Sequence, residues 1–306
     1  MRVETELSRA AIAVASLLFL DAARSETINC TAITNALVPY TITAPGVYCV
    51  TEKISTNLAS GAAITINANN VVLDLNDFAI GNLAAGVSTL AIGVLALDRQ
   101  NIVLQNGILR GFWVGVGLFN GTTFGQATAT SSGHLVQNVT SDHSYVVGII
   151  AEGPDCTVSN SRILSTQGSA VVNPLAPTQV NKAFGIIVEQ GGNAHVSNNA
   201  VFDTACTNGC TASTAFAGGI YAGNAPDAVV DSNAVMNTSI PTAAISAGIT
   251  VDKISPNVLV NGNAVSTWTD GVIYSGTGAT GKYRGNVTQH TTTPYSGGTP
   301  VGTTNF

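Results

Sequence analysis

The stretch FGIIVEQGGNAHVSNNAVFDT, residues 184–204, contains the unit from which most of this chain is built. After Phe184 and the opening Gly185, Ile186 and Val188 are expected to point one way and Ile187 and Glu189 the other, as a strand with two faces requires. A glycine-rich turn follows, then a second apolar strand around Val196, a turn at Asn198 and Asn199, and a third strand around Val201. The stretch therefore predicts three short strands joined by tight turns.

The same sequence pattern recurs along the chain. Seven glycines, each followed by Val or Ile, begin successive copies at spacings of 22, 33, 37, 34, 29 and 23 residues. These glycines are Gly93, Gly115, Gly148, Gly185, Gly219, Gly248 and Gly271. Repetition at such a period is typical of a solenoid, in which each coil buries its apolar face against the next. Because the turns always follow in the same order, we expect neighbouring coils to pair in parallel.

Asparagine marks the turn between the second and third strands. It stands three residues after the second-strand anchor in four copies and two residues after it in three others. The first set is Asn199, Asn233, Asn263 and Asn286, and the second is Asn106, Asn138 and Asn160. Asparagine tolerates the left-handed backbone of a tight corner. Stacked coils would place these amides in a ladder with the spacing of strands, about 4.8 Å.

Composition limits the classes of protein. The 306 residues are 45% hydrophobic and only 9% charged, and the formal net charge is −6. A long, weakly charged chain rich in Val and Ile suits one all-β domain and not a disordered chain. The shortage of cations argues against binding of nucleic acid, which needs clustered basic residues.

Residues 1–25 have the features of an export signal. An apolar run from Ala10 to Leu20 follows Arg2 and Arg9, and Ala23-Arg24-Ser25 offers small residues for cleavage. A buried first helix is the alternative. No later stretch has the roughly 18 consecutive apolar residues of a membrane span. We therefore expect a secreted or periplasmic protein.

Five cysteines fit that location. Cys206 and Cys210 enclose a loop short enough to be closed by a disulfide, and Cys30 is expected to pair with Cys49. Cys156 remains and is expected to be a buried small apolar residue. The spacing of the cysteines and the scarcity of histidine argue against a zinc site.

These features together resemble the right-handed parallel β-helix repeat proteins of the pectate-lyase-like superfamily. The resemblance covers about residues 38–290, and further motifs carry it: TITAPGVYCV at 41–50, NNVVLDLNDFAI at 69–80, GILRGF at 107–112 and the closing KYRGNVTQHTTTPYSGGT at 282–299. It implies a right-handed parallel β-helix of about eight coils at residues 61–290, after a cap at 26–60 and before a polar tail at 291–306. Lyases, hydrolases, epimerases, adhesins and phage spikes share this fold, so the resemblance implies no particular reaction.

The register of the repeats places two carboxylates side by side. Four residues beyond the opening glycine stand Glu152 and Glu189 in successive coils, with Asp252 two coils further along. All three are expected to point outward from the first strands. Two carboxyls about 5 Å apart are the arrangement of a retaining glycosidase, in which repulsion raises one pKa. The alternative is a pair of solvated carboxylates without a catalytic role.

A second outward row is apolar. Ile150, Ile187 and Tyr221 stand two residues beyond the opening glycines, and Tyr221 is expected to stack on a sugar ring. Burial beneath a loop or in an oligomer explains such a row equally well. Insertions at residues 165–183, 203–217 and 236–247 are expected to form a wall beside the first strands, with residues 121–133 on the opposite side. A groove between them is the natural binding surface.

Three further residues are secondary catalytic candidates. Lys182 ends the first insertion and is the cation best placed over the groove. Asp142 and His143 precede the coil opened by Gly148. The resemblance implies functional importance for this edge of the β-helix, because pectate lyases carry calcium and catalytic residues there. His143 would be the base and Asp142 its orienting group, although neighbouring strand residues face apart. His134, His195 and His290 are expected to be solvated or turn residues.

We therefore expect a β-helix that binds an extended polysaccharide, neutral or mildly charged, along its first strands. Whether it also cleaves that ligand as a hydrolase or lyase is left open. No cofactor is expected, and a bound Ca²⁺ ion is the alternative. The rival hypothesis is a noncatalytic envelope or surface protein, either a monomer or a homotrimer joined through the apolar row.

Overall fold

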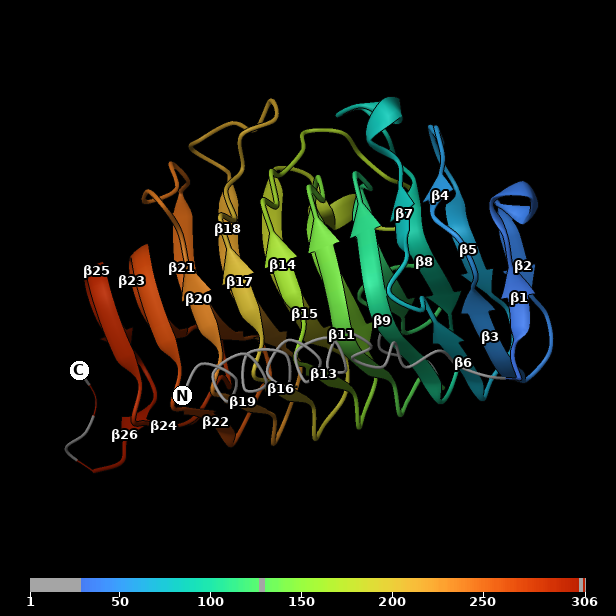
Figure 1. Ribbon diagram of the computed structural model, residues 1–306. Helices are drawn as coiled ribbons and strands as arrows, with labels where there is room; N and C mark the ends of the chain where they lie inside the picture. Colours follow the sequence, from blue (N-terminus) through green and yellow to red (C-terminus); the bar gives the residue numbers. More distant parts are fainter. Residues whose placement is uncertain (1–28, 127–129, 303–304, 306) are drawn as a thin grey trace, which may run out of the picture.

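The computed structural model describes residues 29–126, 130–302 and 305, and the expected signal segment at 1–25 lies outside them. The chain winds into a single tube of stacked coils (Figure 1). Twenty-six strands pair in parallel from coil to coil. The structure thereby confirms the expected right-handed parallel β-helix.

Three faces of the tube are sheets, and the first carries the repeats' opening strands. Gly185 lies on β15 and Gly219 on β18, and these strands are neighbours in register. The first sheet contains β2 (Tyr40–Ile42), β5 (Ala62–Ile66), β8 (Ile92–Leu97), β10 (Val114–Phe119), β12 (Val147–Glu152), β15 (Lys182–Glu189), β18 (Phe216–Gly223), β21 (Ile245–Asp252) and the second halves of β23 (Ala264–Tyr274) and β25 (Val287–Ser296).

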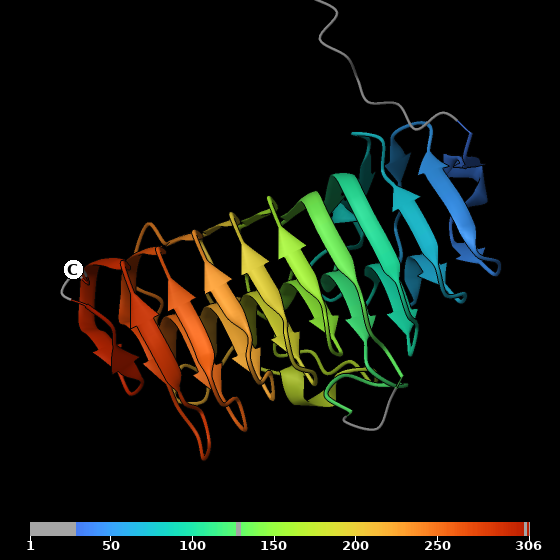
Figure 2. The same ribbon diagram turned by 90° about the horizontal axis from the view of Figure 1, so that it is seen from below.

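The second and third sheets complete each coil (Figure 2). The second contains β1 (Thr31–Ile33), β3 (Gly46–Val50), β6 (Val71–Asp74), the first halves of β9 (Ile102–Arg110) and β11 (Leu135–Asp142), β13 (Thr157–Ser159), β16 (His195–Ser197), β19 (Val229–Asp231), β22 (Val258–Asn261), β24 (Gly281–Arg284) and β26 (Thr299–Pro300). The third contains β4 (Ile54–Ser55), β7 (Ala79–Gly81), the second halves of β9 and β11, β14 (Arg162–Leu164), β17 (Ala200–Phe202), β20 (Ala234–Met236) and the first halves of β23 and β25.

The parallel ladder extends beyond the boundaries expected from the sequence. At the N-terminal end β1 pairs with β3, and β2 pairs with β5, so residues 31–55 already belong to coils. At the other end β25 pairs with β23 and β26 with β24. The segment at 291–300, expected to be a separate tail, thus adds strands because its backbone can continue the ladder.

Short helices interrupt the connections between sheets. They are the 3-10 helices η1 (Asn35–Leu37), η2 (Leu83–Ala85) and η3 (Pro177–Gln179). Together with the long insertions, η2 and η3 lie along one edge of the tube, between the third and first sheets (Figure 1). This edge is therefore where the chain departs most from a regular tube.

The asparagine ladder is confirmed, but the two sets of asparagines have different roles. Asn199, Asn233, Asn263 and Asn286 are buried, and each side-chain amide of the first three donates to the next residue's Oδ1 at 2.9–3.0 Å. The left-handed corner lies one residue earlier, at Asn106, Asn138, Asn160 and Asn198, with φ between 51° and 56°. A ladder residue satisfies buried backbone groups with its amide, while a corner residue supplies the backbone conformation.

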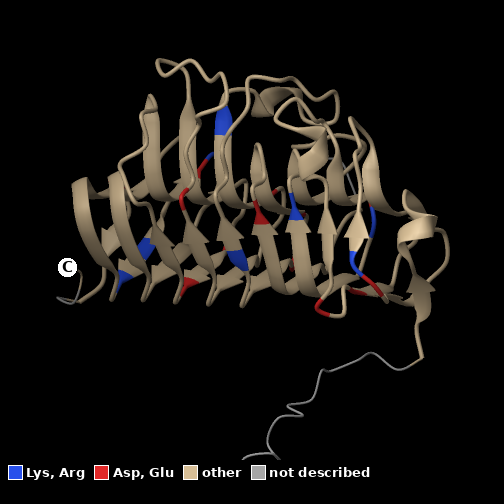
Figure 3. Cartoon of the chain, turned by 45° about the horizontal axis from the view of Figure 1, so that its top comes forward, with Lys and Arg blue, Asp and Glu red and all other residues tan. Residues whose placement is uncertain are grey.

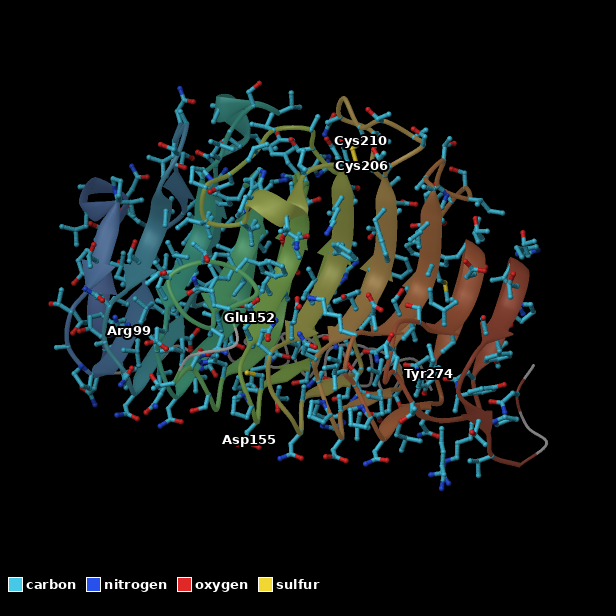
Figure 4. The ribbon with its side chains drawn as sticks, turned by 180° about the vertical axis from the view of Figure 1, so that it is seen from behind. Arg99, Glu152, Asp155, Cys206, Cys210 and Tyr274 are labelled. Atoms are coloured by element: carbon cyan, nitrogen blue, oxygen red, sulfur yellow. A yellow bond between two sulfur atoms is a disulfide. The ribbon has the colours of Figure 1, made fainter. Side chains whose placement is uncertain are left out.

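Both expected disulfides are present, Cys30–Cys49 and Cys206–Cys210, and Cys156 is free and buried. The second disulfide closes the tip of the insertion between β17 and β18, on the loop-bearing edge (Figure 4). Across the described ranges, no helix is both long enough and apolar enough to cross a membrane. Charged residues are sparse along the ribbon (Figure 3).

Candidate functional site

The register expected for the outward carboxylates is confirmed. Glu152 on β12 is the Cα partner of Glu189 on β15, and the row continues through Gly223 on β18 to Asp252 on β21. Partners in neighbouring strands are about 4.8 Å apart. The sequence thus placed the two glutamates correctly as neighbours at the end of adjacent first strands.

The alternative that the two carboxylates are solvated, in contrast, is wrong. Glu152 is 0% and Glu189 2% exposed. The Glu152 carboxylate accepts hydrogen bonds from the backbone N–H of Asn120, at 2.8 Å to Oε2, and of Gly125, at 2.7 Å to Oε1. Burial raises the pKa of Glu152 to about 8, against the opposing effect of these two bonds. Glu152 therefore anchors the loop after β10 and is sealed from any ligand.

That loop is half of a roof over the first sheet. The Phe124 N–H donates to the Leu175 carbonyl at 2.7 Å, which joins the loop after β10 to the insertion between β14 and β15. The insertion extends back to the segment just before β8, where the Asn173 amide donates to the Leu90 carbonyl at 3.0 Å. Leucine, alanine and phenylalanine side chains of the roof pack on the apolar row beneath. The chain itself thus covers the row over β8, β10 and β12.

Ile150 illustrates the consequence. It was expected to contact a ligand, but it is 0% exposed in a cluster with Trp113, Phe119 and Ala176. The sequence identified its outward direction, and the insertion folded onto it. Ile150 therefore contacts the roof, and the expectation that it binds a ligand is wrong.

The first sheet opens again over β15, β18 and β21, where a pocket of about 420 Å³ lies. Four of the predicted site residues besides Glu189 reach it: Lys182, Ile187, Tyr221 and Asp252. The remaining lining residues are Phe124, Thr178, Gln179, Phe184, Phe216, Ile245 and Lys253. The pocket thus has an apolar and aromatic wall and a row of charged groups across its floor.

The charged groups of the floor form pairs. Lys253 forms an ion pair with Glu189, whose Oε1 also accepts from the Gln190 amide at 3.1 Å. The Tyr221 hydroxyl donates to Asp252 Oδ2 at 3.1 Å, and the Lys253 ammonium lies 5.9 Å from the Tyr221 ring centre. Burial lowers the pKa of Lys182 against the opposing charge of Asp252, and burial with the nearby Lys182 lowers the pKa of Lys253. Two cations and two carboxylates therefore balance within the pocket.

The sequence analysis overlooked Lys253. It stands five residues beyond the opening Gly248, one position past the outward row. Its backbone is left-handed, with φ of 58°, as it also is at the equivalent Asp98, Gly153 and Gln190. That corner turns the Lys253 side chain back toward the first sheet. A lysine at a corner usually occupied by Gly, Asn or Asp was the signal available in the sequence.

Gly223 leaves space for this arrangement. It occupies the row position between Glu189 and Asp252, and a Cβ built on it would lie 2.5 Å from Tyr221 Cε1. The Tyr221 ring thus uses the room that a larger residue would fill. Aromatic contacts hold the ring, with centres 5.4 Å from Phe184 and 6.4 Å from Phe216.

Asp142 and His143 lie elsewhere. They were expected to face apart, but His143 Nδ1 lies 2.6 Å from Asp142 Oδ1 because the left-handed backbone at His143, φ 52°, turns it back. Arg110 Nε pairs with Asp142 Oδ2 at 2.7 Å. These residues are at the start of the β12 coil, whereas Glu152 is at the far end of β12. They belong to the third sheet and do not contribute to the pocket.

A metal site is not evident in the parts of the chain that the structure describes, where no three His, Cys, Asp or Glu residues gather. His134 also differs from expectation, since it is 1% exposed. Its Nδ1 accepts from the Ile102 N–H at 3.3 Å, and its Nε2 lies 2.7 Å from Ser131 Oγ. Burial lowers the pKa of His134 to about 4, so it is a neutral core residue at neutral pH.

Comparison of the structure with solved structures identifies other β-helices. The enzymatically active domain of tailspike protein 2 from bacteriophage CBA120 matches with a TM-score of 0.53 and 13% identity, over 84% of this chain and 39% of that domain. The A-module of mannuronan C-5 epimerase AlgE6 from Azotobacter vinelandii matches with 0.48 and 13%, over 90% and 88%. The catalytic domain of a GH87 α-1,3-glucanase with bound tetrasaccharides matches with 0.28 and 12%, over 86% and 63%.

No protein-family model and no curated protein sequence matches the chain. At the identities above, the likeness to solved structures concerns the fold alone, and this chain spans about 39% of the tailspike domain's length. The fold is the one that the repeats predicted. The chain has the fold of the right-handed parallel β-helix proteins.

Proposed function

We propose that the protein binds a neutral polysaccharide outside the cytoplasm, in the pocket over β15, β18 and β21. The observation that carries this proposal is the pairing of an aromatic wall with balanced charged groups in one open cavity. Sugar rings offer apolar faces to aromatic side chains and hydroxyls to carboxylates and ammonium groups. The two disulfides support a location outside the cytoplasm. The β-helix fold, which an enzymatically active tailspike domain shares, and the small number of Lys and Arg residues support this class of ligand.

Binding without cleavage is the function that this geometry supports best. A retaining pair needs one carboxyl that donates a proton and one that attacks, both in contact with the sugar. Glu152 is fully buried with both oxygens on backbone amides, and Glu189 is paired with Lys253. The trimer alternative also loses its basis over β8, β10 and β12, because the chain's own roof covers the apolar row there.

Calorimetric titration with neutral hexasaccharides of glucose, mannose and galactose tests this proposal. We expect one of them to bind, and Phe216→Ala to weaken binding about tenfold because the side chain is part of the aromatic wall. Phe202→Ala is the matched control, since Phe202 is a similarly half-buried phenylalanine on the third sheet. Absence of binding by every neutral glycan would remove the proposal. Release of reducing ends or unsaturated uronate would show that the pocket is catalytic instead.

A further inference from the structure

A second groove lies on the third sheet, on a different face from the pocket. It has a volume of about 510 Å³ and crosses β4, β7, β9, β11 and β14. Ala79 and Gly81 of β7 give it a shallow floor, and Leu83 and Ala84 of η2 stand beside it. Five neighbouring strands make the groove about 19 Å long at the spacing of a sheet. Its length therefore suits a linear ligand rather than a compact one.

The groove concentrates positive charge. Lys53, Arg110 and Arg162 line it, three of the eleven Lys and Arg residues in a chain of net charge −6. Among its lining residues the one carboxylate is Asp142, which is already occupied on both oxygens, by Arg110 and by His143. The carboxylate of Glu52, next to Lys53, accepts instead from the Asn35 N–H at 2.8 Å. The groove thus carries an excess of cations that the surrounding protein does not neutralise.

These cations are available to a ligand. Lys53 and Arg162 are exposed, and neither forms an ion pair or side-chain hydrogen bond with any residue in the described ranges. Arg110 is held to Asp142 through Nε, which leaves its two terminal nitrogens for a further acceptor. A guanidinium held in this way is oriented before a ligand arrives, so binding loses less side-chain entropy.

The cations are evenly spaced along the tube, although Arg110 stands two residues further along its strand than the position in register with Arg162. Lys53 directly precedes β4, Arg110 ends β9 and Arg162 begins β14. The strands pair in the order β4, β7, β9, β11, β14, so successive cations are two strands apart. Two strands correspond to about 10 Å along the tube. This interval is close to the length of one disaccharide in an extended polysaccharide.

We propose that the groove on the third sheet binds a linear acidic polysaccharide carrying one anionic group per disaccharide. Lys53, Arg110 and Arg162 each receive one anionic group, and the aliphatic floor accommodates the sugar rings between them. Asp142 is a positioning residue here because its Oδ2 holds Arg110 Nε, while its Oδ1 lies 2.6 Å from His143 Nδ1. The site is separate from the pocket proposed for a neutral glycan, and either proposal can fail without the other.

Titration with hyaluronan oligosaccharides, which carry one carboxylate per disaccharide, tests the proposal. We expect affinity to rise from the disaccharide to the hexasaccharide, which spans all three cations, and then to level off. The double variant Lys53→Gln/Arg162→Gln is expected to weaken hexasaccharide binding at least tenfold and to make it less sensitive to salt. The matched control is Lys282→Gln/Arg284→Gln, which removes the same charge from exposed residues of β24 on the second sheet.

Several outcomes would overturn the proposal. Equal losses in the two double variants would show that only net charge matters. Full affinity for the disaccharide would contradict the spacing argument, and absence of hyaluronan binding would contradict the site. An oligothymidylate that binds as tightly as the hexasaccharide would identify the groove as a general polyanion surface. Lys182→Gln, in the pocket, is expected to leave hyaluronan binding unchanged.

Discussion

Glu152 and Glu189 occupy equivalent positions on neighbouring strands, yet they lie in different surroundings. Glu152 is under the roof formed by the loop after β10 and the insertion before β15, and its carboxylate binds the backbone of that loop. Glu189 faces the open pocket and pairs with Lys253. Register therefore decides which residues are neighbours, whereas the insertions decide which of them a ligand can reach. The same row of one sheet lies beneath the roof in one half and borders the pocket in the other, although Glu189 itself is almost wholly buried.

The largest expected effect is on the roofed side. Glu152→Ala removes the acceptor of two backbone N–H groups, and we expect the free energy of unfolding to fall by about 3 kcal/mol. Urea denaturation followed by circular dichroism measures this change. Glu52→Ala is the control, because Glu52 is exposed and accepts a single backbone bond, from Asn35. Similar losses in the two variants would contradict the anchoring role of Glu152.

The pH dependence of stability sharpens the same distinction. The folded-state pKa of Glu152 is raised to about 8, so the stability that its protonated form contributes is present below pH 4.5 and is lost as the pH rises toward 8. For His134, with its pKa lowered to about 4, the contribution is present above pH 6.5 and is lost as the pH falls toward 4. Of these two contributions, only that of Glu152 changes between pH 6.5 and 8.

In that window we expect the unfolding free energy of the native protein to fall by about 2 kcal/mol as the pH rises. Glu152→Gln is expected to remove this dependence, and Glu189→Gln is the matched comparison on the open side. Denaturant midpoints at half-unit pH steps measure it. An unchanged slope in Glu152→Gln would assign the dependence to another group.

On the open side the expected effect is smaller. A double-mutant cycle with Lys253→Met and Glu189→Gln is expected to give a coupling of about 1–2 kcal/mol, because Glu189 is almost wholly buried. The corresponding cycle for Arg110 and Asp142, whose carboxylate is more exposed than that of Glu189, is expected to give less than about 1 kcal/mol. Equal couplings would show that burial of Glu189 does not strengthen its ion pair.

The smallest effect concerns the shape of the pocket. Gly223→Ala places a Cβ against the Tyr221 ring, which is expected to shift and to weaken binding of the neutral glycan about fivefold, with a loss of about 1 kcal/mol in stability. Tyr221→Phe removes only the bond to Asp252 and is expected to act less on binding. Calorimetric titration of both variants separates ring position from the hydroxyl. Normal binding by Gly223→Ala would exclude the Tyr221 ring from the contact surface.

Much of the fold could be predicted because it depends on local patterns. The opening glycines fixed the register, since each copy repeats the same phrase, and that register placed Glu152 beside Glu189 and Asp252 two coils beyond Glu189. The Cys206–Cys210 loop was identified for the same reason, as its ends are close in sequence. Strands also lie outside the boundaries expected at residues 60 and 291, because β2 has no opening glycine and β25 is mostly polar.

The candidate site could be predicted only in part. Lys182, Ile187, Tyr221 and Asp252 were identified from their positions in the rows, and all four line the pocket. Ile150 was misassigned and His134 was thought solvated, because nothing in a single sequence says where a long insertion lies. Lys253 was missed since a left-handed corner reverses the direction that strand alternation predicts.

The sequence by itself determined that this protein is a parallel β-helix, which residues stack on which, and which cysteines pair. Repetition makes these properties local, because each coil needs only its own strands and turns to meet the next in register. Only the tertiary structure decided that the insertion before β15 folds back over β8, β10 and β12, and that the pocket therefore lies over β15, β18 and β21. Loop packing joins residues as distant as Leu90 and Asn173, and no periodic pattern in the sequence encodes such a contact.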